Sequence, residues 1–154
     1  MTVYSGGESK GMGLGVKASI QLFTVSEVMS SDYPRFDPKM PMEKAVSLIL
    51  AHPFNGGPVC LTNGKIVGFL SERDCLRRSM ESRYHNYQGG LVESYMKTEV
   101  QTISLGVDLF DAINLFTSQW FHMYPVVDSD DKVLGVVTRK ALLQKVDKLK
   151  QTTW

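Results

Sequence analysis

The stretch GPVCLTNGKIVGFLSERDCL, residues 57–76, recurs in outline as YPVVDSDDKVLGVVTRKALL, residues 124–143. Each holds a Pro-Val pair, a polar turn, an apolar run with a central glycine, and a Ser or Thr before a helical segment. An offset of 67 residues extends the gapless match to residues 25–76 over residues 92–143, with ten identical pairs among 52. Average residue usage predicts about three by chance. The chain therefore contains one supersecondary unit in two copies.

Each copy has the pattern of a β-α-β-β-α unit. A short extended segment (35–36 or 102–103) precedes a helix whose apolar residues recur at i, i+3, i+4 and i+7. These residues are Met42, Ala45, Val46 and Ile49 in the first copy, and Leu109, Ala112, Ile113 and Phe116 in the second. Two strands joined by a polar turn follow (58–61 and 66–70; 125–127 and 133–137), and a closing helix begins near Glu72 or Arg139. The pattern predicts an α+β fold with two similar repeats.

The sequence divides into four parts. Residues 1–22 are rich in glycine, 23–82 and 92–150 hold the two repeats, and 83–91 form a linker. The string at 11–15, GMGLG, faintly suggests a phosphate loop, but no strand precedes it and its spacing fits neither nucleotide motif. We therefore expect residues 1–22 to be a flexible or loosely docked arm.

Composition excludes several classes of partner. The chain of 154 residues has a net charge of +1, which gives no electrostatic reason for binding nucleic acid or an anionic membrane. Cys60 and Cys75 lack a CxxC partner, and the three histidines do not have the spacing of metal ligands, so no metal site is expected. No apolar run is long enough to cross a membrane, and no secretory signal is apparent. We expect a cytoplasmic protein.

The ordered motif resembles the tandem cystathionine-β-synthase (CBS) domain pair over roughly residues 22–146. The signature of this family is a Pro-Val pair, a turn, an apolar strand and a helix. The strand leads into the helix through Gly-h-h-[Ser/Thr]-x-x-Asp, where h is a hydrophobic residue and x is any residue. The stretches VSEVM (25–29) and VESYM (92–96) resemble the opening motif of the family. The resemblance implies two repeats packed with pseudo-two-fold symmetry around two clefts. It also implies a regulatory module that needs no cofactor and binds an adenosine-containing ligand: AMP, ADP or ATP, with S-adenosylmethionine as another candidate.

One cleft has a complete motif, Ser71-x-x-Asp74. A carboxylate that accepts hydrogen bonds from both hydroxyls of a ribose forms charge-assisted bonds, which are stronger than neutral ones. Ser71 also suits the N-cap of the closing helix, and the two roles are compatible. By the resemblance, this cleft further includes Val100, Gln101 and Thr102 at the adenine edge and Phe121, His122 and Met123 on the other wall. His122 is the first candidate for a phosphate contact and Arg73 the second, although His122 could simply pack near Trp120 and Tyr124.

The second cleft departs from the motif. Thr138 is present, but Ala141 stands where the aspartate would be, and alanine cannot accept a hydrogen bond from a ribose hydroxyl. The cleft of Arg35, Phe54, Thr138 and Arg139 is therefore expected to bind nucleotide weakly or not at all, although Arg139 could attract an anion. We predict one good site per chain.

No catalytic constellation is recognisable, so we expect no enzyme. Two functions are left open. The module could sense a ligand and signal to an unidentified protein partner in trans, or it could be a dimerisation or docking scaffold with an empty cleft. The intact Ser71-x-x-Asp74 favours sensing, and Ala141 keeps the scaffold open. The resemblance also implies a homodimer formed through helices.

Overall fold

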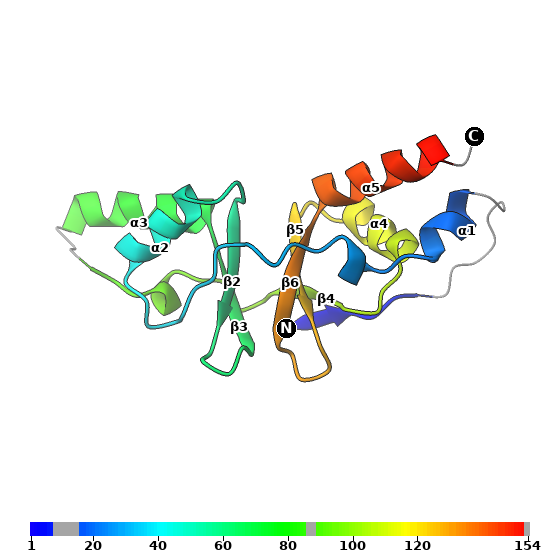
Figure 1. Cartoon of the computed structure of the whole chain (residues 1–154). Helices are drawn as coiled ribbons and strands as arrows, with labels where there is room; N and C mark the ends of the chain where they lie inside the picture. Colours follow the sequence, from blue (N-terminus) through cyan, green and yellow to red (C-terminus); the bar gives the residue numbers. More distant parts are fainter. Residues whose placement is uncertain (8–15, 86–88, 153–154) are drawn as a thin grey trace. The chain divides into compact units, whose positions relative to one another are not determined.

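The computed structural model describes residues 1–7, 16–85 and 89–152, and it divides into two compact units (Figure 1). Unit 1 comprises Met1, Asp32–Val100 and Asp130–Val133, and unit 2 comprises Thr2–Ser31, Gln101–Ser129 and Leu134–Trp154. Neither unit is coextensive with one sequence repeat. Unit 2 contains residues 25–29, which open the first repeat, and unit 1 contains residues 92–96, which open the second. We call these two stretches the lead-in segments.

Unit 1 has a two-stranded antiparallel sheet and two α-helices. Its elements in chain order are α2 (Met42–Leu50), β2 (Gly56–Cys60), β3 (Ile66–Ser71), α3 (Glu72–His85) and the 3-10 turn η2 (Val92–Ser94). Pro41 is the N-cap of α2, and the predicted apolar face buries Met42, Ala45 and Ile49. These side chains pack with Phe36, Val59 and Leu70 in one hydrophobic cluster. The predicted extended segment at 35–36 is a single parallel bridge between Phe36 and Val59.

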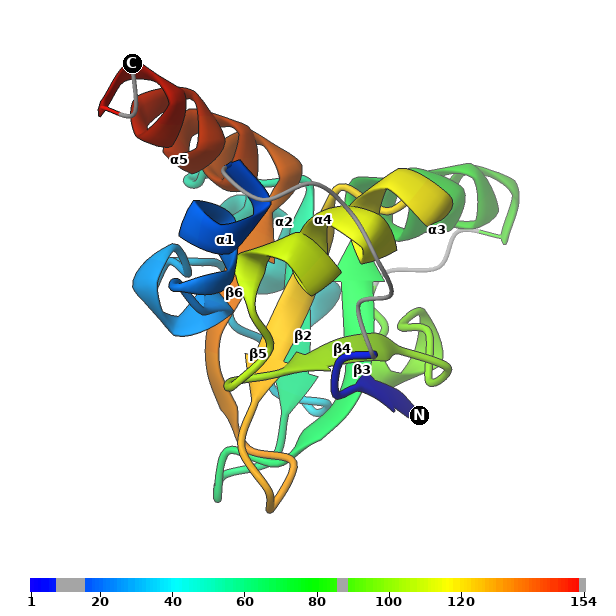
Figure 2. The ribbon, with the colours of Figure 1, turned by 90° about the vertical axis from the view of Figure 1, so that its right-hand side faces the viewer.

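Unit 2 has a four-stranded sheet in the order β1-β4-β5-β6. Its elements are β1 (Thr2–Tyr4), α1 (Val16–Gln21), η1 (Val25–Glu27), β4 (Gln101–Ser104), α4 (Leu109–Ser118), β5 (Met123–Val127), β6 (Val133–Thr138) and α5 (Arg139–Thr152). Helix α4 connects the parallel strands β4 and β5, and Asp108 caps it by accepting a hydrogen bond from the Asp111 backbone N–H. Helices α1, α4 and α5 pack together (Figures 1 and 2). The core is formed mainly by Ile103, Leu109, Phe116, Tyr124 and Val126.

The lead-in segments explain two of the identical pairs in the repeat. In unit 1, Lys97 forms an antiparallel bridge with Phe69, and in unit 2, Ser30 forms one with Val136. The methionine that ends each lead-in segment lies against the strand glycine of that unit: Met96 against Gly68, and Met29 against Gly135. A side chain at either glycine would collide with the lead-in segment, so both positions need glycine for close approach.

Residues 1–22 differ from the expectation of a loose arm. Thr2–Tyr4 form strand β1, which pairs in parallel with β4, and Val16–Gln21 form helix α1, whose Ile20 is buried in the core of unit 2. The loose-arm prediction is wrong for these two stretches. It failed because three strand residues and one short helix carry too little periodicity to be seen in the sequence. The string at 11–15 lies outside the described residues.

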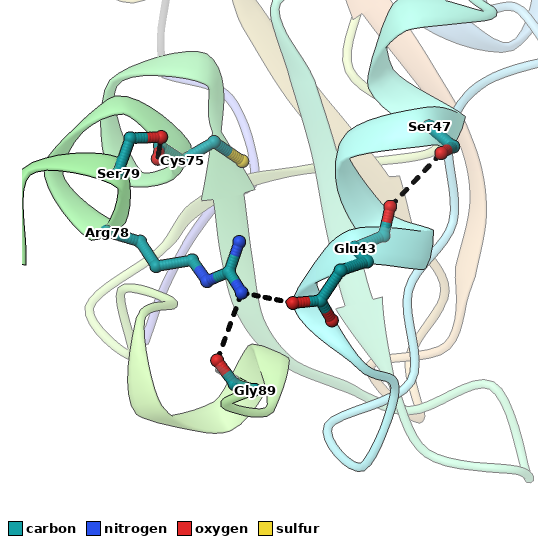
Figure 3. Close-up of polar contacts among 6 residues, drawn as sticks. All are labelled: Glu43, Ser47, Cys75, Arg78, Ser79 and Gly89. Carbon is teal, nitrogen blue, oxygen red and sulfur yellow. Dashed lines mark hydrogen bonds and ion pairs between the residues drawn. The ribbon is translucent and has the colours of Figure 1, made fainter. Parts of the chain in front are cut away.

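Arg78 of α3 contacts both helix α2 and the end of the linker, all within unit 1 (Figure 3). Its Nη2 donates hydrogen bonds to Glu43 Oε1 of α2 and, at 3.0 Å, to the carbonyl O of Gly89. The Gly90 carbonyl accepts from the Met42 backbone N–H at 3.0 Å. Gly89 and Gly90 have φ of +112° and +106°, a conformation that favours glycine. These contacts hold the end of the linker against the start of α2.

Candidate functional site

The predicted motif Ser71-x-x-Asp74 lies where β3 ends and α3 begins. The Asp74 backbone N–H donates to Ser71 Oγ at 3.3 Å, so Ser71 caps the helix as predicted. Asp74 bonds back, because its Oδ2 accepts from the Ser71 backbone N–H at 2.9 Å and from Ser71 Oγ at 2.8 Å. This reciprocal pattern is a capping box with aspartate in place of the usual Glu or Gln. It fixes the carboxylate at the helix N-terminus.

The other carboxylate oxygen of Asp74, Oδ1, takes no part in this capping box. Asp74 is 1% exposed, and its Oδ1 has no hydrogen-bond partner among the described residues. The nearest cation is Arg77, whose Nη1 lies 3.8 Å from Oδ1, beyond hydrogen-bond distance. A buried acceptor without a donor costs free energy. Oδ1 is therefore the polar atom of this site that a ligand donor would satisfy.

The backbone beside this helix start comes from the same unit. The Asn55 carbonyl accepts from the Glu72 N–H at 2.8 Å, and Gly56 pairs with Ser71 across the sheet. A Cβ on Gly56 would lie 2.9 Å from the Ser71 Cα. The sequence alone predicts that Phe54, the residue before Asn55, lies in the other cleft. Asn55 is the equivalent of His122 at the fixed offset of 67 residues, but the offset alone does not show which helix start either residue lies beside.

The second copy keeps half of this arrangement. The Ala141 backbone N–H donates to Thr138 Oγ1 at 3.1 Å, so the cap is present without the returning carboxylate. The His122 carbonyl accepts from the Arg139 N–H at 3.1 Å, and the Arg139 guanidinium contacts His122 Nδ1. The sequence reasoning assigned these two residues to different clefts. In the structure they form one cluster in unit 2, because β5 begins beside the start of α5.

The remaining predicted residues divide between the units. Gln101 and Thr102 lie on β4, and both side chains donate to the Thr2 carbonyl of β1, at 3.1 and 3.3 Å. Phe121 is 54% exposed, with its ring edge-to-face against Tyr124. Because Asp74 belongs to unit 1, whereas Gln101, Thr102 and residues 121–123 belong to unit 2, their joint cleft stays a prediction. So does the proximity of Val100, which is buried in unit 1, and of Arg73, which is exposed on α3.

Unit 1 also contains two buried cysteines and a surface groove. Burial raises the pKa of the Cys60 and Cys75 thiols, which makes both poor nucleophiles. A shallow groove of about 630 Å³ lies beside Lys39, Asn63 and Met96, away from every predicted site residue.

Two features are absent from residues 1–7, 16–85 and 89–152. No group of three or more His, Cys, Asp or Glu side chains is placed there to hold a metal ion. No helix there is long and apolar enough to span a membrane.

The sequence matches the CBS domain family twice, at residues 25–81 and 92–148. The chain belongs to this family. Both matches begin at a lead-in segment and contain the strand glycine and the helix-start motif described above. The fold is the mixed α+β arrangement of a CBS pair.

Solved CBS pairs share the fold. CBSX2 of Arabidopsis thaliana, crystallised in complex with AMP, is 25% identical, with a TM-score of 0.71 over 83% of this chain and 98% of that one. The CBS domain pair of protein MJ0100, in complex with 5-methylthioadenosine and S-adenosyl-L-methionine, is 19% identical, with a TM-score of 0.67 over 82% and 97%.

An enzyme also contains the same region. Homoserine O-acetyltransferase of Methanocorpusculum labreanum is 26% identical over 119 residues, which cover 77% of this chain but 23% of that enzyme. The similarity therefore concerns a CBS region within a much longer protein.

Proposed function

We propose that this CBS pair is a regulatory module that binds an adenosine-containing ligand of the AMP, ADP or ATP class and catalyses no reaction. The observation that carries the proposal is Asp74 Oδ1, a buried carboxylate oxygen without a hydrogen-bond donor among the described residues. A ribose hydroxyl would supply that donor in a charge-assisted bond. The AMP complex of CBSX2 supports this ligand class. S-Adenosylmethionine is the competing ligand, which the MJ0100 complex suggests only through its fold.

The geometry favours a division of roles at the site. Oδ2 of Asp74 is committed to the capping box, so Oδ1 takes the ligand hydroxyl. Arg73 stands one residue earlier in the first turn of α3, where a phosphate also gains from the helix N-terminus. His122 is engaged with Arg139. We therefore assign the phosphate contact at the Asp74 site to Arg73, and we keep Val100, Gln101 and Thr102 at the adenine edge.

Signalling would require a surface for other proteins. Leu76 on α3 and Leu143 on α5 occupy equivalent positions in the two repeats, and each is 69% exposed. Met80, one turn after Leu76, is also exposed. We propose that this apolar face of the closing helices forms a homodimer, which reports ligand binding to a partner in trans. Light scattering of the wild type and of a Leu76→Glu/Leu143→Glu variant tests the dimer.

Titration calorimetry with AMP, ADP, ATP and S-adenosylmethionine tests the ligand. Asp74→Asn is the informative variant, because an amide oxygen can still accept at the cap while the charge is lost. Hydrogen bonds to charged groups contribute about 1.5–3 kcal/mol, so we expect affinity to fall roughly ten- to hundredfold. Arg139→Gln, in the cleft without an aspartate, is the control and should bind as the wild type does. The absence of heat with all four ligands would instead support the scaffold, which the Ala141 departure keeps open.

A further inference from the structure

Strand β1 accepts hydrogen bonds from Gln101 and Thr102, two residues of the proposed ligand site. It pairs in parallel with β4 in the register Thr2 to Gln101, Val3 to Thr102 and Tyr4 to Ile103 (Figure 2). Beyond the backbone pairing, the Thr2 carbonyl accepts from Gln101 Nε2 at 3.1 Å and from Thr102 Oγ1 at 3.3 Å. One carbonyl of β1 therefore holds the side-chain donors of both residues.

A second contact holds the same segment in place. The Gly7 N–H donates to Asp111 Oδ2 at 3.3 Å, so the chain after β1 is fastened to α4. With β1 in place, Thr102 is fully buried, and its hydroxyl is directed at Thr2. The second repeat thus presents Gln101 and Thr102 to the protein's own N-terminal strand.

We infer that β1 is an intramolecular strap that competes with the ligand for Gln101 and Thr102. The inference rests on the proposed function, which places these two residues at the adenine edge. A donor that is committed to Thr2 cannot serve a ligand at the same time. Binding would then require β1 to leave β4, and the strap would reduce the apparent affinity by the fraction of molecules in which it is open.

The strap is built to open at small cost. It is a three-residue strand at the sheet edge in which Thr2 and Val3 are exposed, and only Tyr4 is partly buried against the core of unit 2. Short edge segments with little apolar burial lie at the low end of local opening free energies. A ligand with a modest preference for the open state can therefore shift the population.

Calorimetric titration of three proteins with AMP tests the strap and the proposed function independently of each other. In Val3→Pro/Tyr4→Pro, the prolines remove two of the three backbone N–H groups of the strand and disfavour its pairing with β4, whereas Thr2→Ala keeps the carbonyl that accepts from Gln101 and Thr102. We expect the proline variant to bind AMP about tenfold more tightly than the wild type, the gain when about one molecule in ten is open. Thr2→Ala should bind as the wild type does. Equal affinity of all three proteins overturns the strap and leaves the proposed function standing. If none of the three proteins binds AMP, ADP, ATP or S-adenosylmethionine, both the strap and the proposed function are overturned.

Hydrogen exchange of the unaltered protein gives an independent readout, in case the proline variant does not fold. Saturating AMP should speed exchange in a peptide covering residues 2–7, because the ladder with β4 opens. Binding of AMP with unchanged or slower exchange there contradicts the strap.

Discussion

A Cβ placed on Gly68 would lie 2.6 Å from the Sδ of Met96, and the same relationship recurs at 2.9 Å between Gly135 and Met29. At each site the backbone carbonyl of the residue that follows the lead-in segment also lies within 3 Å of that Cβ: Lys97 at 2.9 Å and Ser30 at 2.8 Å. The methionines could move aside, because their side chains are flexible. The carbonyls cannot, because they belong to the bridges that hold the segments.

Gly68→Ala should therefore destabilise the protein. Overpacking of this kind costs about 1–3 kcal/mol, measurable as a lower midpoint of urea unfolding. Gly106→Ala is the matched control, since no described atom lies within 4 Å of a Cβ there. The control should be neutral or slightly stabilising. Equal midpoints for the two variants would show that the lead-in segment yields at no cost.

Tyr124→Phe should stabilise the protein. Tyr124 is fully buried in the core of unit 2, and its hydroxyl has no hydrogen-bond partner among the described residues. Removing an unsatisfied buried polar group recovers about 1–3 kcal/mol, and the edge-to-face packing on Phe116 does not depend on the hydroxyl. Chemical denaturation at pH 7 gives the comparison. A loss of stability would mean that the hydroxyl is satisfied in solution.

The same residue gives a pH dependence. Burial raises the pKa of Tyr124 to about 12, whereas an unfolded tyrosine titrates near 10. Between these values the unfolded state binds fewer protons than the folded one, so stability falls as the pH rises. Tyr124→Phe should lose less stability than the wild type from pH 10 to pH 12. Parallel curves in this window would contradict the assignment.

Ala141→Asp should restore the second site. The new carboxylate would stand three residues after Thr138, as Asp74 does after Ser71, and could return a bond to the cap of α5. An acidic group in the first turn also stabilises a helix by about 0.3–1 kcal/mol. We expect calorimetric stoichiometry with AMP to rise from one to two per chain. Ala141→Asn, without the charge, should leave it near one.

Arg78→Ala should cost more stability than Arg77→Ala. The Arg78 side chain is 13% exposed and bonds to Glu43 and to the Gly89 carbonyl, whereas Arg77 is 56% exposed and forms one distant ion pair. Losing the charged hydrogen bonds of the largely buried Arg78 costs about 1–3 kcal/mol, and an ion pair of 3.8 Å whose arginine is mostly exposed contributes about 0–1 kcal/mol. Thermal unfolding of both variants tests the order. If Arg77→Ala is the more destabilised, the tie between the linker and α2 is not stabilising.

Sequence periodicity predicted the repeated elements well, for a physical reason. Each predicted helix face is the face that is buried: Met42, Ala45 and Ile49 in α2, and Leu109, Ala112 and Phe116 in α4. The turn around Gly64 and the cap at Ser71 followed from local backbone chemistry. These features depend on near neighbours in the chain, so the sequence carries them directly.

Features that depend on distant contacts were missed. The offset showed that His122 and Asn55 are equivalent, but not which helix start each lies beside. Strand β1 has three residues and forms only by pairing with β4, about a hundred residues away. Periodicity carries no information about such pairings. It therefore could not predict that β1 pairs with β4, or that each lead-in segment belongs to the unit formed mainly by the other repeat.

The composition of the two units bears on the order in which they complete during synthesis. Unit 1 is nearly contiguous, but unit 2 joins residues 2–31 to residues beyond 100. At about 5–20 residues per second, residues 2–31 would wait roughly 3–14 s while residues 32–100 are synthesised, before the rest of unit 2 begins to emerge. During that interval the apolar side chains of Ile20 and Val25, which are buried in the folded unit 2, have no core to pack against and stay exposed on the nascent chain.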